Sequence, residues 1–137
     1  MSAVQTTRQL VVCALGAEEY ALPIGAVREI VRAMPPRPVA SDLPWMRGVI
    51  SLRGRLVPVY DLAQRLGVER ASPAAPAAKI VIVETAAELV GVLVDDVVEV
   101  LSVDEQQIEE VPSGSGQIAR LGERLVLLLD VVDLDAP

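Results

Sequence analysis

The chain has 137 residues, enough for one compact domain or for two small units that share a core. Its net charge of −7 argues against nucleic acid as a partner, because nucleic-acid binding relies on a basic surface that neutralises phosphates. The sequence contains no histidine, which removes the commonest general base and the commonest metal ligand. We therefore expect no enzymatic activity, no metal site and no cofactor.

A share of 52% hydrophobic residues, with 2% aromatics and no phenylalanine, predicts a core of Val, Leu, Ile and Ala. The single cysteine, Cys13, excludes an intramolecular disulfide, and its alternating apolar context favours a buried small side chain over a reactive thiol. The first residues lack the hydrophobic region of a signal peptide. No apolar run reaches the ~20 residues that span a bilayer, since Asp130 and Asp133 interrupt the longest. We expect a cytoplasmic protein with no membrane insertion.

Short apolar runs alternate with turn signals along the first half, which is typical of a β protein. Strands are expected at 8–15, 19–24, 26–33 and, within 45–62, on both sides of Arg53-Gly54. The proline cluster at 35–38 ends the third strand, because proline cannot continue a hydrogen-bond ladder. Asp61 is expected to cap a short helix at 62–66 that ends at Gly67.

The second half follows a linker. Residues 69–78 carry two prolines and little periodicity, which indicates a connection between two folded units. The polar passage farther along contains Ser113–Gly116, which we expect to form a flexible loop. Strands are expected at 79–85, 88–94, 96–103 and 123–130.

The two halves of the chain repeat each other. Residues 10–31 reappear in outline at 80–101, a shift of 70, and residues 55–62 reappear at 124–131, a shift of 69. About five strands per copy suit a small closed barrel, and two such barrels can bury a joint apolar seam. The sequence therefore predicts one all-β domain, residues 1–137, of two five-stranded β-barrels packed around a shared hydrophobic core. The expected barrel boundaries are 8–68 and 79–134.

The most specific string in the chain is GVISLRGRLVPVYDL at 48–62. It follows YALPI at 20–24 and VREIV at 27–31, and the second half supplies VGVLVDDVVEVL at 90–101 and RLVLLLD at 124–130. In this order, over roughly 8–134, the segments closely resemble the CheW family of chemotaxis coupling proteins. The resemblance implies that both barrels are SH3-like. It also implies a non-enzymatic adaptor that couples chemoreceptors to the histidine kinase CheA within a signalling array.

The resemblance further implies a receptor site in the groove between the barrels. Its expected residues are Arg53, Glu29, Val27, Ile30, Val97 and Val100. Arg53 is the leading candidate, because a tight turn should project it into solvent and the second copy has Gly122 near that position. Glu29 recurs in the second copy as Glu99, so it is either a partner contact or an architectural charge. Each valine and isoleucine is either core or groove lining.

For the kinase, the resemblance implies contacts at Gly48, Val49 and Gly54, whereas a bulge and a turn would equally account for the two glycines. The stretch between Pro112 and Arg124 is several residues shorter than the family pattern, which identifies a divergent member with a shortened second barrel. The alternative function is therefore an adaptor that binds receptors or other CheW-like proteins but not the kinase. The hypothesis from a different functional class is that the protein is an enzyme, and no nucleophile motif supports it.

Overall fold

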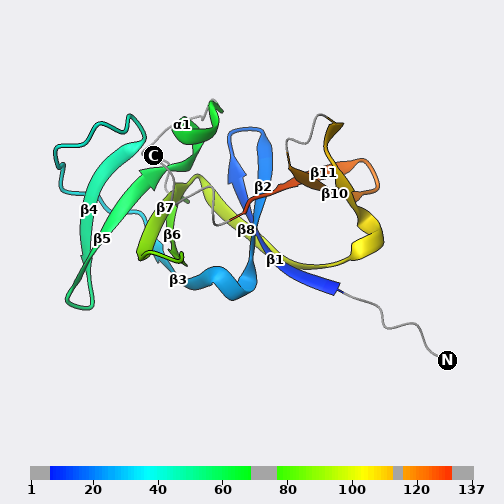
Figure 1. Cartoon of the computed structure of the whole chain (residues 1–137), viewed down its shortest axis with the longest axis horizontal. Helices are drawn as coiled ribbons and strands as arrows, with labels where there is room; N and C mark the ends of the chain where they lie inside the picture. The colour runs from blue at the N-terminus through cyan, green and yellow to red at the C-terminus, as the bar shows by residue number, and fades with distance from the viewer. Residues whose placement is uncertain (1–6, 69–76, 113–115, 131–137) are drawn as a thin grey trace.

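The computed structural model describes residues 7–68, 77–112 and 116–130 and shows an all-β protein with one short α-helix (Figure 1). The elements of the first half are β1 (Thr7–Leu15), β2 (Glu18–Pro23), the 3-10 turn η1 (Ile24–Ala26), β3 (Val27–Arg32), β4 (Met46–Leu52), β5 (Arg55–Asp61) and α1 (Leu62–Leu66). Those of the second half are β6 (Lys79–Glu84), β7 (Leu89–Val94), β8 (Asp96–Asp104), the 3-10 turn η2 (Glu105–Gln107), β9 (Ile108–Glu110), β10 (Gln117–Leu121) and β11 (Arg124–Leu128).

Every strand expected from the sequence is present, and so is the helix. The Gln64 amide donates to Asp61 Oδ1 at 3.2 Å, which makes Asp61 the N-cap, and Gly67 ends α1 in the left-handed conformation with φ 73°. Two strands were not expected: β9 has only three residues, and β10 lies in the stretch before Arg124 that the sequence showed as a shortened loop. The linker residues 69–76 and the loop residues 113–115 lie outside the described residues.

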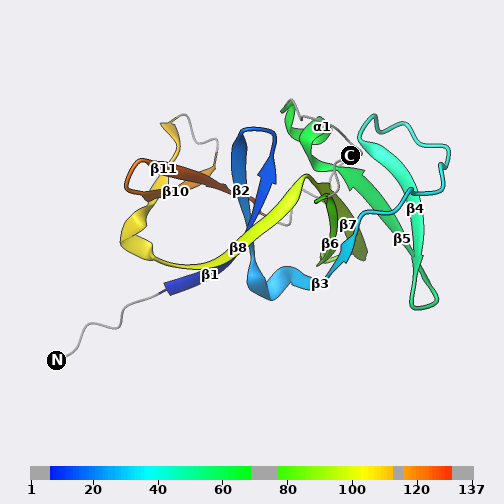
Figure 2. The same ribbon diagram turned by 180° about the vertical axis from the view of Figure 1, so that it is seen from behind.

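The strands form two sheets that draw on both halves of the chain. The six-stranded sheet has the order β8-β1-β2-β11-β10-β9, and the five-stranded sheet has the order β3-β6-β7-β5-β4. The first hairpin of each copy therefore lies in the sheet that holds the later strands of the other copy. Figures 1 and 2 show the two resulting barrels side by side, with β1 and β2 in the middle of the molecule.

The expected boundaries 8–68 and 79–134 therefore follow the sequence copies and do not coincide with the two sheets. Each exchanged hairpin is joined to the other copy by one parallel strand pair: β2 pairs with β11, and β7 pairs with β5. These pairs are equivalent under the repeat, so the exchange is reciprocal. Alternation of apolar and polar residues identifies strands in a sequence. It does not show which strands pair, because pairing depends on contacts between distant residues. The six-stranded sheet also exceeds the expected five strands, because β9 is added beside β10.

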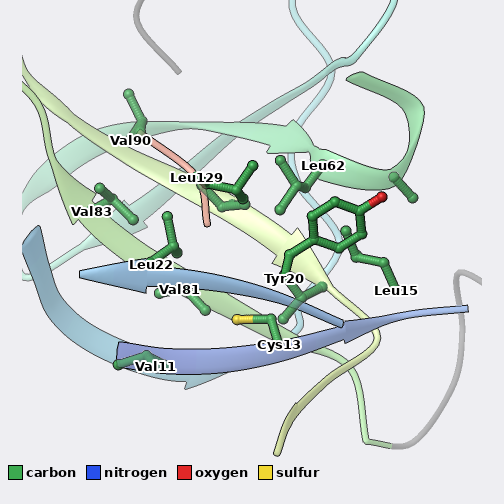
Figure 3. Packing of buried hydrophobic residues seen from close by; sticks show 13 residues of the cluster. Val11, Cys13, Leu15, Tyr20, Leu22, Leu62, Val81, Val83, Val90 and Leu129 are labelled. Carbon is green, nitrogen blue, oxygen red and sulfur yellow. The ribbon is translucent and has the colours of Figure 1, made fainter. Parts of the chain in front are cut away.

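The shared core follows from alternation along the exchanged hairpins. In β1, Leu10 and Val12 face the interior of the six-stranded barrel, whereas Val11, Cys13 and Leu15 face the other barrel. The same alternation recurs 70 residues later in β6: Ile80 and Ile82 lie inside the five-stranded barrel, and Val81 and Val83 face outward. The outward-facing side chains from β1, β2, β6, β7 and α1 meet in one cluster (Figure 3). The shared hydrophobic core predicted from the sequence is confirmed.

Cys13 lies inside this shared core and is 1% exposed. Burial, with a smaller effect from the charge of Asp96, raises the pKa of the Cys13 thiol to about 12. Because the thiolate is the reactive form, the native protein should react with a thiol-specific reagent such as DTNB only at a trace rate at neutral pH, and should label fully in guanidinium chloride. Rapid stoichiometric labelling without denaturant would show that the thiol is accessible and reactive.

Candidate functional site

Arg53 occupies a two-residue hairpin loop between β4 and β5. Leu52 and Arg55 close the loop as a cross-strand pair, and both loop residues are left-handed, Arg53 at φ 52° and Gly54 at φ 81°. Positive φ at both central residues defines a type I′ turn, which matches the twist of the flanking strands. The turn holds the Arg53 side chain 75% exposed at the end of the hairpin, as the sequence predicted.

Arg53 is paired with another candidate residue, Glu29 on β3. Arg53 Nη2 donates to Glu29 Oε2 at 2.8 Å, and Arg53 Nε donates to Glu29 Oε1 at 3.2 Å. This two-point geometry lowers the pKa of Glu29, chiefly through the side-chain hydrogen bond, and raises the pKa of Arg53. The structure therefore brings together two residues that lie 24 positions apart and fixes the direction of the exposed guanidinium.

The recurrence of Glu29 as Glu99 has a structural basis. Each glutamate directly follows an irregularity in its strand pairing, between Val27 and Glu29 on β3 and opposite Val12 and Cys13 on β8. Glu99 is likewise held by an arginine, with Arg124 Nη2 at 2.7 Å from Glu99 Oε2. Both glutamates therefore accept from an arginine side chain.

The second-copy arginine is more enclosed than Arg53. Arg124 also donates to both carboxylate oxygens of Glu19 on β2, at 2.6 and 3.0 Å, and is 33% exposed. These hydrogen bonds, first from Glu19 and then from Glu99, raise the pKa of Arg124. Sequence comparison of the copies could not reveal this network, because Glu19, Glu99 and Arg124 are brought together only by the exchanged sheet.

The apolar receptor candidates divide into two kinds. Val27 and Val97 pack against the shared core, whereas Ile30 and Val100 are 40% and 55% exposed. These exposed side chains lie on β3 and β8, which are the outermost strands of their sheets. Figure 2 shows β8 in front, with η1 and β3 below it. Val98, 44% exposed on β8, was not among the expected residues, and it lies at the irregularity in the pairing of β8 with β1.

The three kinase candidates differ in their surroundings. Gly48 is buried, and an added Cβ would lie 2.1 Å from the carbonyl oxygen of Arg37, because Arg37 and Val49 form a backbone bridge over this point. Gly54 has open space around it, and its positive φ serves the turn. Val49 is half-buried on β4, directly opposite Pro58. Backbone geometry therefore accounts for both glycines, and Val49 is the candidate that presents a side chain.

Within residues 7–68, 77–112 and 116–130, no three Asp, Glu or Cys side chains gather in a way that could hold a metal ion. Across the same residues, no helix is long and apolar enough to span a membrane.

The exposed groups of the site lie on outer strands and on a hairpin turn of a double barrel, which is the geometry of a protein-binding module. The family model of the CheW-like domain matches residues 9–136, and the chain therefore belongs to the CheW family. It is 35% identical over 126 residues to the probable chemotaxis protein CheW of Rhizobium etli, and this match covers 92% of this chain and 81% of that protein. It is 32% identical over 134 residues to the chemotaxis protein CheW of Rhizobium meliloti, with 94% and 86% covered.

A solved structure supports the same conclusion. The crystal structure of the scaffolding protein TtCheW from Thermoanaerobacter tengcongensis matches with a TM-score of 0.84 and 28% sequence identity. The match covers 92% of this chain and 86% of that one. The family and the fold of two SH3-like barrels, both expected from the sequence motifs, are confirmed.

Proposed function

We propose that the protein is a chemotaxis adaptor that binds the tips of chemoreceptors and couples them to the histidine kinase CheA within cytoplasmic receptor arrays. Membership of a family whose similar members are chemotaxis proteins supports the adaptor role. The observation that carries receptor binding is the Arg53 guanidinium, which is exposed yet fixed in direction by Glu29. On this proposal the protein performs no chemistry of its own and holds receptor and kinase in one geometry.

The Arg53–Glu29 pair suits recognition of a polar helix tip. A guanidinium has five N–H donors in a planar fork, and Glu29 engages those on Nε and Nη2. The remaining donors are available to carboxylates or carbonyls of a partner. Because the side chain is already held in one direction, binding loses less conformational entropy than it would with a mobile arginine. Ile30 and Val100 supply exposed apolar surface on β3 and β8 for the same receptor.

We expect Arg53→Glu to weaken binding of a receptor cytoplasmic fragment by about tenfold or more, because it removes the donors and sets a carboxylate against Glu29. Thermal unfolding should stay close to that of the wild type, since the pair is exposed to solvent and exposed ion pairs contribute little to stability. Arg120→Glu is the matched control, because Arg120 is also an exposed arginine paired with a glutamate but lies on β10. Equal binding by Arg53→Glu and the wild type, with both folded, would remove Arg53 from the receptor site.

The alternative is an adaptor that binds receptors or other CheW-like proteins but not the kinase. The short connection after β9 favours it: six residues, 111–116, separate β9 from β10, and the Val111 amide donates to the Gly116 carbonyl oxygen at 2.8 Å. Pull-down of the purified protein with the regulatory domain of the kinase separates the two functions. Kinase binding as strong as receptor binding would eliminate the alternative, and failure to bind either partner would eliminate both.

A further inference from the structure

A surface cavity of about 470 Å³ lies on the five-stranded barrel, between β3, β5 and the turn that joins β6 to β7. Its volume falls within the roughly 300–1,000 Å³ that is typical of small-molecule sites. None of the residues expected to contact the receptor or the kinase lines it. Its walls carry two arginines and two glutamates, Arg28, Arg55, Glu84 and Glu88, together with apolar side chains.

The turn that forms one wall of this cavity is fixed by a buried threonine, Thr85. Its hydroxyl donates to the Glu88 carbonyl oxygen at 2.8 Å and accepts from the amides of Ala87 and Glu88 at 3.3 and 3.1 Å. The Thr85 amide donates to the same carbonyl oxygen at 2.9 Å. Because these hydrogen bonds define the turn before any ligand arrives, binding does not have to order this wall.

Two of the four charged side chains neutralise each other, because Arg28 Nη2 forms an ion pair with Glu84 Oε2. The side chains of the other two, Arg55 and Glu88, form no ion pair or hydrogen bond with each other or with any other group among the described residues. The cavity therefore presents a free guanidinium and a free carboxylate on walls that are otherwise neutral.

The sequence repeat shows what an arginine at the position of Arg55 binds in the other barrel. Its counterpart is Arg124, which donates to both carboxylate oxygens of Glu19 at 2.6 and 3.0 Å. In the five-stranded barrel, Leu89 stands at the position of Glu19 and lines the cavity together with Arg55. The carboxylate that satisfies the arginine of one barrel is thus replaced by an apolar side chain in the other.

The other acceptor of Arg124 has also found a different partner in the five-stranded barrel. This acceptor is Glu99, which corresponds to Glu29, and Arg53 holds Glu29 at 2.8 Å. Arg55 therefore lacks both carboxylates that satisfy Arg124. Its planar fork of N–H donors is open to a carboxylate from outside the chain.

We propose that this cavity binds a free amino acid with an apolar side chain, whose carboxylate is held by Arg55 and whose ammonium group is held by Glu88. The apolar part of the ligand lies against Leu89, Ala86 and Ala87, which line the same cavity. A ligand with two carboxylates would set the second one against Glu88, and an amine without a carboxylate would leave Arg55 unpaired. This site goes beyond the proposed adaptor function and does not rest on it.

The test is an NMR titration of the full-length protein with L-valine, isovalerate and isobutylamine. These probes share one branched alkyl group and carry both charged groups, only the carboxylate, or only the ammonium group. L-valine should bind with a Kd of about 1 mM, and each of the other two should bind at least about fivefold more weakly. Arg55→Gln should weaken L-valine binding by about tenfold. Glu88→Gln should bind L-valine no more tightly than isovalerate. Arg120→Gln is the control, because Arg120 is an exposed arginine on β10, outside the cavity.

A second pair of variants tests the comparison between the barrels. Leu89→Glu restores a carboxylate at the position that Glu19 occupies in the other barrel, so it should pair with Arg55 and abolish L-valine binding. Leu89→Gln has the same size but no charge, and it should bind L-valine within about threefold of the wild type. Circular dichroism checks that both variants are folded.

Three outcomes would overturn the inference. The first is that the wild type shows no saturable binding of L-valine, or binds all three probes equally. The second is that isovalerate binds as tightly as L-valine, because Glu88 would then take no part. The third is that Arg55→Gln binds L-valine as well as the wild type does, which would place the ligand elsewhere. The experiment contains neither receptor nor kinase, so each of these outcomes leaves the proposed adaptor function standing.

Discussion

Replacing Gly48 by alanine should lower the free energy of unfolding by about 3 kcal/mol or more, which corresponds to a fall of about 10 °C in Tm. Gly48 has φ 138°, a conformation that L-residues rarely adopt, and an added Cβ would lie 2.1 Å from Arg37 O and 2.6 Å from Arg37 C. These are backbone atoms, so the clash cannot be relieved by turning a side chain. The bridge between Arg37 and Val49 would have to open and β4 would have to shift.

Chemical denaturation followed by circular dichroism measures this effect. Gly25→Ala is the matched control, because an added Cβ at Gly25 meets nothing within 4 Å and its φ lies outside the left-handed region. The control should change the free energy of unfolding by about 0.5 kcal/mol or less. If Gly48→Ala were as stable as Gly25→Ala, the close approach of Arg37 to β4 would be wrong.

The second large effect concerns the shared core. Leu22 on β2 is fully buried in the cluster between the barrels, and Leu22→Ala should lower the free energy of unfolding by about 3 kcal/mol, the sum of lost burial and a residual cavity. Because this cluster joins side chains from both sheets, unfolding of one barrel would expose the apolar face of the other. The loss should therefore appear as one cooperative transition that shifts as a whole.

Trp45 makes this prediction measurable. It is the single tryptophan, its carbonyl accepts a hydrogen bond from the Asp61 amide at the end of β5, and the Arg65 guanidinium lies 4.7 Å from its ring centroid. Its fluorescence thus reports on the five-stranded barrel, whereas Leu22 belongs to the other sheet. Fluorescence and circular dichroism should shift together in Leu22→Ala, while the half-exposed Leu125→Ala should shift little. A fluorescence transition that stays at the wild-type position would contradict the coupling of the barrels.

Most of the fold could be predicted because apolar alternation and turn residues are local signals. The apolar residues in 8–15 and 79–85 indicated two strands, and Asp61 and Gly67 marked the ends of α1. The exchange of hairpins could not be predicted, since the pairing of β1 with β8 and of β2 with β11 depends on contacts between distant residues. β9 and β10 were missed because their alternation is short and carries polar residues at exposed positions.

The site could be predicted only in part, for a similar reason. The turn at Arg53-Gly54 is determined by local sequence, and the exposure of the Arg53 side chain could be predicted from the turn. The glutamate partners of the two arginines could not be predicted, because Glu29 on β3 is far in sequence from the turn that holds Arg53, and Arg124 on β11 contacts Glu19 on the neighbouring β2. Gly48 and Gly54 were expected to contact the kinase or to serve the backbone. The structure supplies a backbone reason for each, and kinase contact remains a prediction that centres on Val49 and its neighbours.

The central claim is that this protein couples receptor and kinase. The most direct measurement is kinase autophosphorylation in a reconstituted mixture of receptor cytoplasmic fragment, kinase and this protein. We predict that the kinase co-sediments with the receptor and responds to it only when the wild-type protein is present, and that Arg53→Glu abolishes both effects while Arg120→Glu does not. Kinase recruitment and activity that are the same with and without the protein would contradict the account.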